Sequence, residues 1–124
     1  MTRALIVEDN DNFRHALRKM LSNNFPTLTF DEARNGTEAL DLISSSCPDL
    51  VFMDIKLPGE NGLQIARKIR GVYEKTKIII LTSYDFPEYR EAARNYGANH
   101  FVSKGSSSAD DIVKLVSSLL AEMT

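Results

Sequence analysis

The sequence of 124 residues has a single cysteine, little excess charge and no long hydrophobic run. Cys47 lies in a turn-like stretch and has no second cysteine, so neither an intrachain disulfide nor a cysteine metal site is expected. The formal net charge of −2 gives no broad electrostatic reason to bind nucleic acid. A run of only four apolar residues precedes the acidic pair Glu8 and Asp9, too short for a signal peptide or a membrane span. We therefore expect a cytoplasmic protein.

The chain also lacks internal repeats, low-complexity tracts and an interdomain linker. A chain of this length can bury one continuous hydrophobic core and falls in the size range of one domain. The sequence therefore predicts a single domain over residues 1–124, with no output domain in this chain.

The sequence does contain short apolar runs, separated by segments in which apolar residues recur with helical spacing. Runs of this length are typical of strands, and the spacing between them is typical of helices. The predicted strands are 4–7, 28–30, 50–53, 78–81 and 101–102. The alternation predicts an α/β fold, a three-layer doubly wound (βα)5 domain whose five-stranded parallel sheet is covered on both faces.

Polar residues three positions apart mark several helix starts, because a capping side chain is often followed by a polar partner at that spacing. The predicted pairs are Asn35 with Glu38, Asn61 with Gln64, Asp85 with Glu88, and Ser108 with Asp111.

Chemically active side chains follow four of the five predicted strands. Glu8 and Asp9 follow the first run, Asp54 the third, Thr82 the fourth, and Lys104 closely follows the fifth. In open α/β sheets, functional residues lie beyond the carboxyl ends of the strands. These side chains are therefore expected to meet at one edge of the sheet.

Three carboxylates in one place repel one another unless a cation neutralises them, and hard oxygen ligands at this density favour Mg²⁺. Because Mg²⁺ commonly binds one or two carboxylates together with substrate phosphate, phosphoryl transfer is the expected chemistry. Lys104 offers a compact positive charge to phosphate oxygens, and Thr82 offers a hydroxyl donor. Asp54 is then the natural nucleophile, because carboxylates form acyl-phosphates.

Each of these residues taken alone also has a purely structural interpretation. Glu8 and Asp9 could be acids favoured near a helix start, Asp54 a turn residue and Lys104 a solvated loop charge. Their combination at four strand ends of one sheet edge favours a functional site.

Four segments, in this order and spacing, resemble the response-regulator receiver domains of bacterial two-component systems. They are IVED at 6–9, VFMDIKLPG at 51–59 followed by Gly62, ILT at 80–82, and FVSK at 101–104. The resemblance covers essentially the whole chain. It implies a flavodoxin-like strand order of 2-1-3-4-5, which places the three acids at the switch point between the first and third strands.

The resemblance also implies roles for individual residues of the metal site. Asp54 would be the phosphoacceptor, Asp9 a direct Mg²⁺ ligand and Glu8 a ligand through water. The backbone carbonyl of Lys56 would complete the protein ligands.

Further implied roles concern the phosphoryl group and the switch. Thr82 would hydrogen-bond the phosphoryl group and Lys104 would pair with it. Phe101 stands where the family has a Tyr or Phe whose rotamer reports phosphorylation, and without a hydroxyl it must act through packing. Gly105 follows Lys104 where many receivers have a cis proline. A cis bond without proline costs about 2.5–4 kcal/mol, so the geometry of this bond is left open.

The first functional hypothesis is a phosphorylation-dependent signalling switch rather than an enzyme, limited to its own phosphorylation and dephosphorylation. A sensor histidine kinase or phosphotransfer protein would be the partner. The face made by the fourth helix, fifth strand and fifth helix would change, with homodimerisation as one outcome. The blocks around Asp54 and Thr82 look closest to receivers that precede a helix-turn-helix domain, so DNA would be contacted only through such an output domain.

Two alternatives belong to other classes. A haloacid-dehalogenase-like phosphatase needs a second Asp two residues after the nucleophile, and Lys56 stands at that position. A non-phosphorylated receiver-like scaffold would keep the fold without the chemistry, but the complete set of site residues argues against it. His15 is placed on the polar side of the first helix beside Arg14 and Arg18, as a surface residue.

Overall fold

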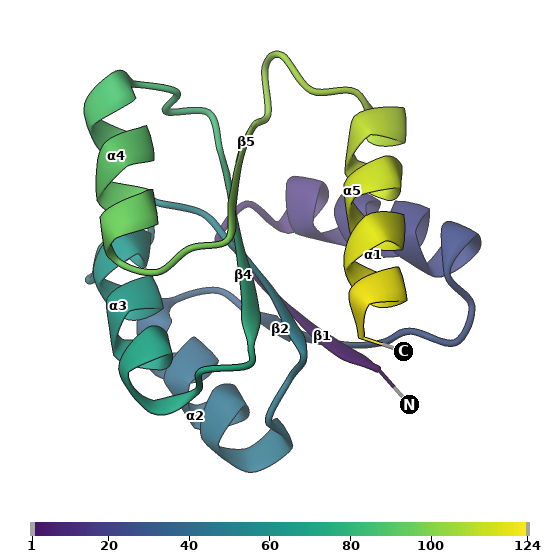
Figure 1. Ribbon diagram of the computed structural model, residues 1–124, viewed down its shortest axis with the longest axis horizontal. Helices are drawn as coiled ribbons and strands as arrows, with labels where there is room; N and C mark the ends of the chain where they lie inside the picture. The colour runs from purple at the N-terminus through teal and green to yellow at the C-terminus, as the bar shows by residue number, and fades with distance from the viewer. Residues whose placement is uncertain (1, 124) are drawn as a thin grey trace.

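Five strands form one parallel sheet in the computed structural model, which describes residues 2–123 (Figure 1). The strands are β1 (Arg3–Val7), β2 (Thr29–Ala33), β3 (Leu50–Met53), β4 (Lys77–Thr82) and β5 (His100–Ser103). Their order is β2-β1-β3-β4-β5, which confirms the predicted topology. The second strand runs further than predicted because polar residues Asp31 and Glu32 belong to it. As an edge strand, β2 is only partly buried and does not need a continuous apolar run.

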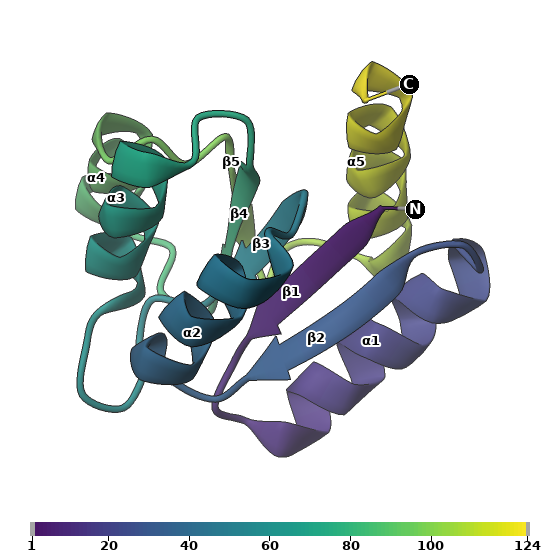
Figure 2. The ribbon, with the colours of Figure 1, turned by 90° about the horizontal axis from the view of Figure 1, so that it is seen from below.

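Five helices alternate with the strands and cover both faces of the sheet. They are α1 (Asp11–Asn24), α2 (Gly36–Ser46), α3 (Gly62–Val72), α4 (Pro87–Asn95) and α5 (Ala109–Glu122). Helices α1 and α5 lie on one face, and α2, α3 and α4 lie on the other (Figures 1 and 2). Among residues 2–123, no helix has the length and apolar character needed to cross a bilayer.

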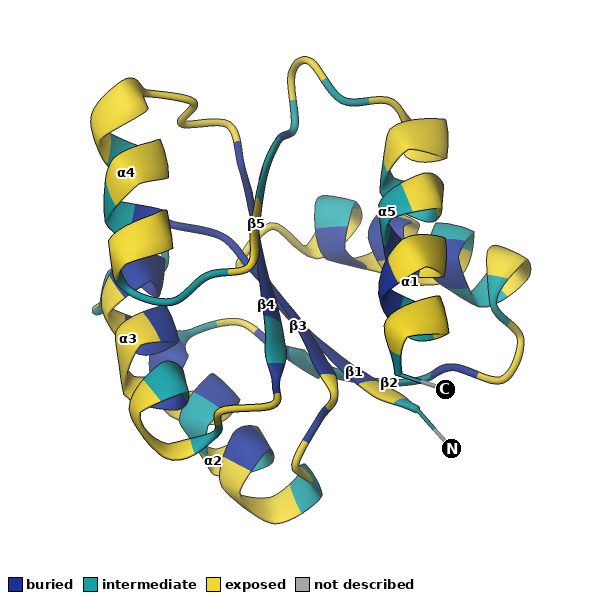
Figure 3. Ribbon diagram, viewed as in Figure 1, coloured by how far each residue is buried: buried dark blue, intermediate teal, exposed yellow. Residues whose placement is uncertain are grey.

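The hydrophobic core is divided in two by the sheet, because alternate residues of a strand point to opposite faces. Val51 and Met53 pack with the α2–α4 layer, whereas Leu50 and Phe52 pack with the α1–α5 layer. The central strands β1, β3 and β4 are accordingly buried, while the outer helix faces are exposed (Figure 3). The buried strands provide a rigid base for the polar groups at their ends.

Three of the four predicted helix starts are confirmed, although the capping bonds differ. The Asn35 side chain accepts from the Glu38 N–H at 2.9 Å. Ser108 and Asp111 form a reciprocal capping box. Asn61 caps α3, but its side chain accepts from the Leu63 N–H at 2.7 Å, whereas the Gln64 N–H donates to the Asn61 backbone carbonyl at 3.0 Å.

The predicted cap at Asp85 is wrong. Helix α4 begins at Pro87 with Phe86 at the N-cap position, and no side chain caps it. The Asp85 carboxylate accepts two hydrogen bonds from Arg90 instead, at 2.5 and 3.0 Å. Two hydrogen bonds from a charged guanidinium are stronger than one capping bond from a backbone N–H, so the Asp85 carboxylate pairs with Arg90.

Gly62 makes the closest backbone approach near the functional edge. A Cβ at this position would lie 1.8 Å from the carbonyl oxygen of Asp54, so any other residue would displace the chain there. The Gly62 N–H donates to the carbonyl of Ile55 at 2.8 Å. The start of α3 therefore fixes the backbone just after β3.

Arg70 joins several segments at the amino-terminal edge of the sheet, opposite the edge where the predicted site lies. Its guanidinium donates to the backbone carbonyls of Gly97, Tyr73, Glu74 and Thr76 and to the Asn99 side chain. These acceptors come from the end of α3, the approach to β4 and the loop before β5. Among residues 2–123, no carboxylate pairs with this guanidinium, so burial lowers its pKa.

We predict that Arg70→Met lowers the free energy of unfolding by about 2 kcal/mol, because several partly buried carbonyls lose a charged donor. Urea unfolding followed by circular dichroism measures this change. Lys68→Met is the matched control on the same helix. Its side chain makes one exposed ion pair with Glu60, and its loss should cost less than about 1 kcal/mol. Equal losses in the two variants would contradict the bridging role of Arg70.

Candidate functional site

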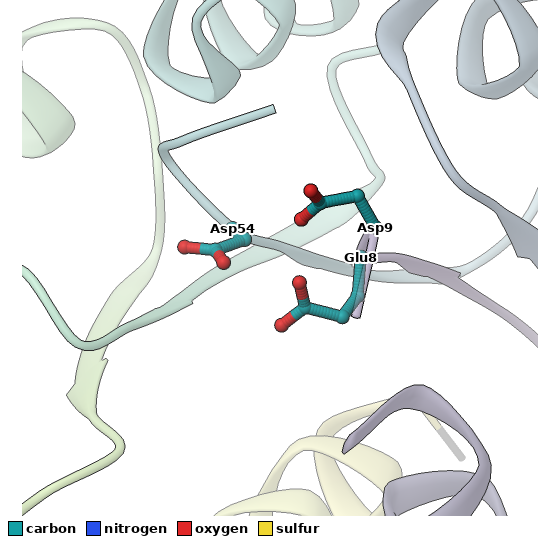
Figure 4. Close-up of side chains that lie close together, drawn as sticks. All are labelled: Glu8, Asp9 and Asp54. Atoms are coloured by element: carbon teal, nitrogen blue, oxygen red, sulfur yellow. The ribbon is translucent and has the colours of Figure 1, made fainter. Parts of the chain in front are cut away.

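Three carboxylates converge at the carboxyl edge of the sheet, as predicted. Glu8 and Asp9 follow β1 and Asp54 follows β3, the neighbouring strand, in which Met53 lies opposite Val7. One oxygen from each carboxylate lies within 4.8 Å of the others. Figure 4 shows the three side chains gathered at this edge. Glu8 and Asp54 are buried, whereas Asp9 is exposed.

Lys104 supplies the positive charge of this cluster from beyond β5. Its ammonium donates to one oxygen of Glu8 and, at 3.2 Å, to Oδ2 of Asp54. The same ammonium lies 4.1 Å from the ring centroid of Phe13 on α1. Lys104 is therefore within reach of a group attached to Asp54, but Glu8 also holds it. No peptide bond among residues 2–123 is cis, so the Lys104–Gly105 bond is trans.

The hydrogen bonds of Asp54 fix its carboxylate. Oδ1 accepts from the Ile55 N–H at 2.7 Å, and Oδ2 accepts from Lys104. The Asp54 backbone N–H donates to the Val7 carbonyl at 3.1 Å, which extends the pairing of β1 and β3 to the site. The Asp54 side chain is thereby held at the edge and not free to turn away.

Thr82 ends β4 and is fully buried, next to the cluster in the strand order. Its hydroxyl oxygen accepts from the Tyr84 N–H at 3.2 Å, and its carbonyl accepts from the Lys104 N–H at 2.9 Å. The second contact joins β4 to the segment that carries the lysine. A movement of Thr82 would thus act on both the β4–α4 loop and Lys104.

Lys56, two residues beyond Asp54, extends its side chain toward α4. The ammonium lies over the rings of Tyr84 and Tyr89, 5.3 and 5.6 Å from their centroids. Lys56 therefore links the loop after β3 to the loop after β4 through cation–π contacts.

Phe101, the predicted switch residue, is half-buried on β5. The guanidinium of Arg90 on α4 lies 4.7 Å from its ring centroid. Since Arg90 also holds Asp85, the loop between β4 and α4 is connected to the Phe101 ring.

Burial dominates the electrostatics of Glu8. Desolvation raises the pKa of this carboxyl, and the negative charge of Asp54 raises it further. Hydrogen bonds from Lys104 and the Asn10 N–H oppose this effect, but the net pKa is above the usual 4.5. The charged form of Glu8 is therefore costly in the metal-free fold.

The acidic cluster fits a divalent cation. It offers hard carboxylate oxygens, one of them exposed to solvent, at separations that a single ion could bridge. Mg²⁺ prefers such ligands and retains several waters, and an exposed ligand at the edge leaves room for them. Glu8, Asp9 and Asp54 are the residues that could hold it.

Arg14 is a residue that the sequence interpretation misplaced. Grouped there with His15 and Arg18 on the polar side of α1, it is in fact buried, with 6% of its surface exposed. Its guanidinium reaches the Glu8 carbonyl. In the sequence, only the three-residue spacing between Asp11 and Arg14, which suits an ion pair on one helix face, pointed to a partner for Arg14. His15 is exposed, as predicted.

A doubly wound parallel sheet of strand order 2-1-3-4-5 defines the flavodoxin-like class of α/β proteins, and here an acidic cluster lies at the switch point between β1 and β3. Within that class, the family model described as response regulator receiver domain matches residues 4–117, and the chain belongs to this family. It is a receiver domain of the two-component response regulators, a regulatory phosphoacceptor rather than a catalyst. The acidic cluster is consistent with a phosphoacceptor site.

Individual relatives agree with this assignment. Response regulator MprA of Mycobacterium tuberculosis is 35% identical over 102 residues, which are 82% of this chain and 44% of that protein. The chain thus spans less than half the length of this curated relative.

Solved structures agree as well. Response regulator TrrA of Thermotoga maritima, in complex with Mg²⁺-BeF, is 37% identical with a TM-score of 0.84, over 96% of this chain and 99% of that chain. A two-component response regulator of the LuxR family from Aurantimonas is 30% identical with a TM-score of 0.89, over 98% of this chain and 87% of that chain.

We predict that Glu8→Gln raises the stability of the metal-free protein in EDTA at pH 7. The raised pKa of Glu8 means that wild type loses stability as pH rises from the unfolded value through the folded one. Glutamine cannot ionise, so the variant avoids this loss. Urea unfolding at pH 7 and near pH 4 measures the difference, which should vanish at the lower pH.

Glu32→Gln is the control with the opposite sign. Burial alone would raise the pKa of Glu32, but hydrogen bonds from Arg18 and Arg14 outweigh it and lower the pKa. This variant should be less stable than wild type at pH 7, with the difference shrinking as pH falls through the lowered pKa. If both variants shift stability in the same direction at pH 7, the assigned electrostatics of Glu8 are wrong.

Proposed function

We propose that this chain is a phosphorylation-dependent switch in which Asp54 accepts a phosphoryl group in a Mg²⁺-dependent reaction. The donor is a phosphohistidine on a sensor histidine kinase or a phosphotransfer protein. One observation carries the proposal: the buried Asp54 carboxylate lies beside two other acids and accepts a hydrogen bond from the Lys104 ammonium.

The metal ligands in this proposal are Asp9 directly, Glu8 through water, the Asp54 carboxylate and the backbone carbonyl of Lys56. The convergence of the acids supports it, and the relative TrrA has been solved with Mg²⁺-BeF. When bound, Mg²⁺ would neutralise the carboxylates and stabilise charge on the phosphoryl oxygens.

In the transfer step, an Asp54 carboxylate oxygen forms a bond to phosphorus while the bond from phosphorus to the donor imidazole nitrogen breaks. The electron pair of that bond stays on the nitrogen. Lys104 exchanges its hydrogen bonds to carboxylates for one to a phosphoryl oxygen, since its ammonium already contacts Asp54. The Thr82 hydroxyl, next in the strand order, donates to another phosphoryl oxygen.

We predict that Asp54→Asn abolishes the gain of one phosphoryl mass on incubation with acetyl phosphate and Mg²⁺. An amide lacks the nucleophilic carboxylate, so the loss should be complete within detection. Intact-mass spectrometry reports the product. Asp49→Asn, which removes an acid at the opposite edge, should be phosphorylated like wild type.

EDTA should prevent phosphorylation of wild type. Rapid turnover of acetyl phosphate without accumulation would favour a phosphatase. No mass change in wild type would favour a non-phosphorylated scaffold. Phosphorylation of Asp54→Asn at the wild-type rate would remove Asp54 from its role.

The output of the switch is proposed to pass through the β4–α4 loop to α4, β5 and α5. The loop begins after Thr82, and Asp85 within it holds Arg90, which lies over the Phe101 ring. When Thr82 turns toward a phosphoryl group, the loop moves and the Asp85–Arg90–Phe101 contact changes with it. Arg90 thus supplies the restraint that a tyrosine hydroxyl would otherwise provide. The altered surface would bind a partner or a second copy of the chain.

We predict that Arg90→Met shifts the Phe101 ring toward its activated position without phosphorylation. The cation–π contact contributes about 0.5–1 kcal/mol, so its loss should change the ratio of the two ring positions about two- to fivefold. NMR of the Phe101 ring, with beryllofluoride and Mg²⁺ defining the activated endpoint, measures the ratio.

Arg94→Met is the matched control, because Arg94 lies one turn further along α4. Its Phe101 spectrum should match that of wild type. If beryllofluoride changes the spectrum only around Asp54 and never at Phe101 or α4, this route of transmission is refuted while the phosphorylation chemistry stands.

A further inference from the structure

Arg14 makes three charge-assisted hydrogen bonds from a buried position on α1. Nη1 donates to the Glu8 backbone carbonyl at 2.8 Å, Nε to Glu32 at 2.9 Å, and Nη2 to Asp11 at 2.7 Å. The three acceptors lie beyond β1, on β2 and in the first turn of α1. One planar guanidinium therefore joins three elements beside the acidic cluster.

We propose that Arg14 is a positioning residue for the metal site, which it serves by fixing the peptide group between Glu8 and Asp9. The inference rests on the proposed function, because it concerns affinity for Mg²⁺. Arg14 itself touches neither the metal nor the phosphoryl group in this scheme.

The argument begins with the rigidity of the peptide bond. The Glu8 carbonyl and the Asp9 nitrogen belong to one planar unit, so a hydrogen bond to that carbonyl sets where Asp9 begins. The preceding peptide is fixed as well, because the Glu8 N–H donates to the Ala33 carbonyl at 2.9 Å. The backbone is thus anchored on both sides of Glu8.

Asp9 depends on this anchoring more than the other two acids. Glu8 and Asp54 each have a carboxylate held by Lys104. The exposed Asp9 carboxylate accepts no hydrogen bond from residues 2–123. Its position is therefore set by its backbone, and the Glu8 carbonyl is the point where Arg14 controls that backbone.

An ordinary structural role, in which Arg14 only joins α1 to β2, makes a different prediction. Arg18 also bonds Glu32, at 2.5 Å, and so contributes to the same junction. Among residues 2–123, no other side chain donates to the Glu8 carbonyl. Arg18 is consequently a matched control that shares the ion pair but lacks the contact with the acidic segment.

Replacing Arg14 with lysine separates an effect of the guanidinium geometry from an effect of the positive charge alone. Arginine presents several donors in fixed directions and can hold three acceptors together, whereas lysine offers one compact ammonium. If Arg14 acted only through its positive charge, lysine would replace it. If it acts by holding the Glu8 carbonyl while bound to Glu32 and Asp11, lysine would not.

The test is a calorimetric Mg²⁺ titration of the whole chain as wild type, Arg14→Met, Arg14→Lys and Arg18→Met, with folding verified by circular dichroism. Residues that orient metal ligands typically change affinity about ten- to a hundredfold, so Arg14→Met should raise the Mg²⁺ Kd by that factor. Arg14→Lys should recover little of the affinity. Arg18→Met should stay within about twofold of wild type, because its ion pair is exposed.

Phosphorylation by acetyl phosphate gives a second readout that loss of stability alone would not produce. The Arg14 variants should be slow at low Mg²⁺ and approach the wild-type rate at saturating Mg²⁺, because the acceptor Asp54 is intact. A structural role would lower the melting temperatures of the Arg14 and Arg18 variants without moving the Mg²⁺ midpoint.

An unchanged Kd in folded Arg14 variants, an equal rise in Arg18→Met, or full recovery by Arg14→Lys overturns the inference. If Arg14→Met does not fold, the Kd of Arg14→Lys decides: a rise supports the inference and a wild-type value overturns it. A wild type that binds no Mg²⁺ overturns this inference and the proposed function together. A wild type that binds Mg²⁺ alongside unaffected Arg14 variants overturns this inference alone.

Discussion

Three carboxylates and a single lysine ammonium share the carboxyl edge of the sheet, and this charge imbalance is the constraint on which the site depends. Lys104 contacts Glu8 and Asp54 but cannot neutralise all three acids. Like charges at this separation are unfavourable, and the charge of Asp54 contributes to the raised pKa of Glu8. The buried and paired central strands β1 and β3 nevertheless hold the acids together. The unbalanced negative charge at this edge is what makes the cluster suited to a divalent cation.

Much of the fold and of the site could be predicted because both depend on local patterns, namely short apolar runs and the residues that directly follow them. An apolar run such as Leu50–Met53 marks a buried strand by itself, and its end fixes the place of Asp54. Once parallel strands are inferred, their carboxyl ends must meet at one edge, so the convergence of Glu8, Asp9 and Asp54 follows from topology. No knowledge of individual contacts was needed.

The contacts that could not be predicted join charged side chains whose pairing depends on the three-dimensional path of the chain. Arg14 meets Glu32 through the register of α1 on β2, and no local pattern shows that a charged residue will be buried there. Asp85 had the spacing of a cap, but its actual partner depends on the path of the loop to Arg90. The predicted bounds of the edge strand β2 were wrong for a related reason. Its polar residues belong to the strand because they pair with β1, and the sequence pattern does not show that pairing.

The two edges of the sheet respond differently to acid, because the Arg70 hydrogen bonds at the amino-terminal edge involve no carboxylate. The acceptors of Arg70 are backbone carbonyls and an amide oxygen, which take up no proton in the acid range. Contacts nearer the site use carboxylates: hydrogen bonding to Arg90 lowers the pKa of Asp85, and Arg18 and Arg14 lower that of Glu32 against the effect of burial. Their stabilisation is lost as pH falls through those lowered values. Acidification would therefore weaken the ion pairs of Asp85 and Glu32 while leaving the Arg70 hydrogen bonds intact.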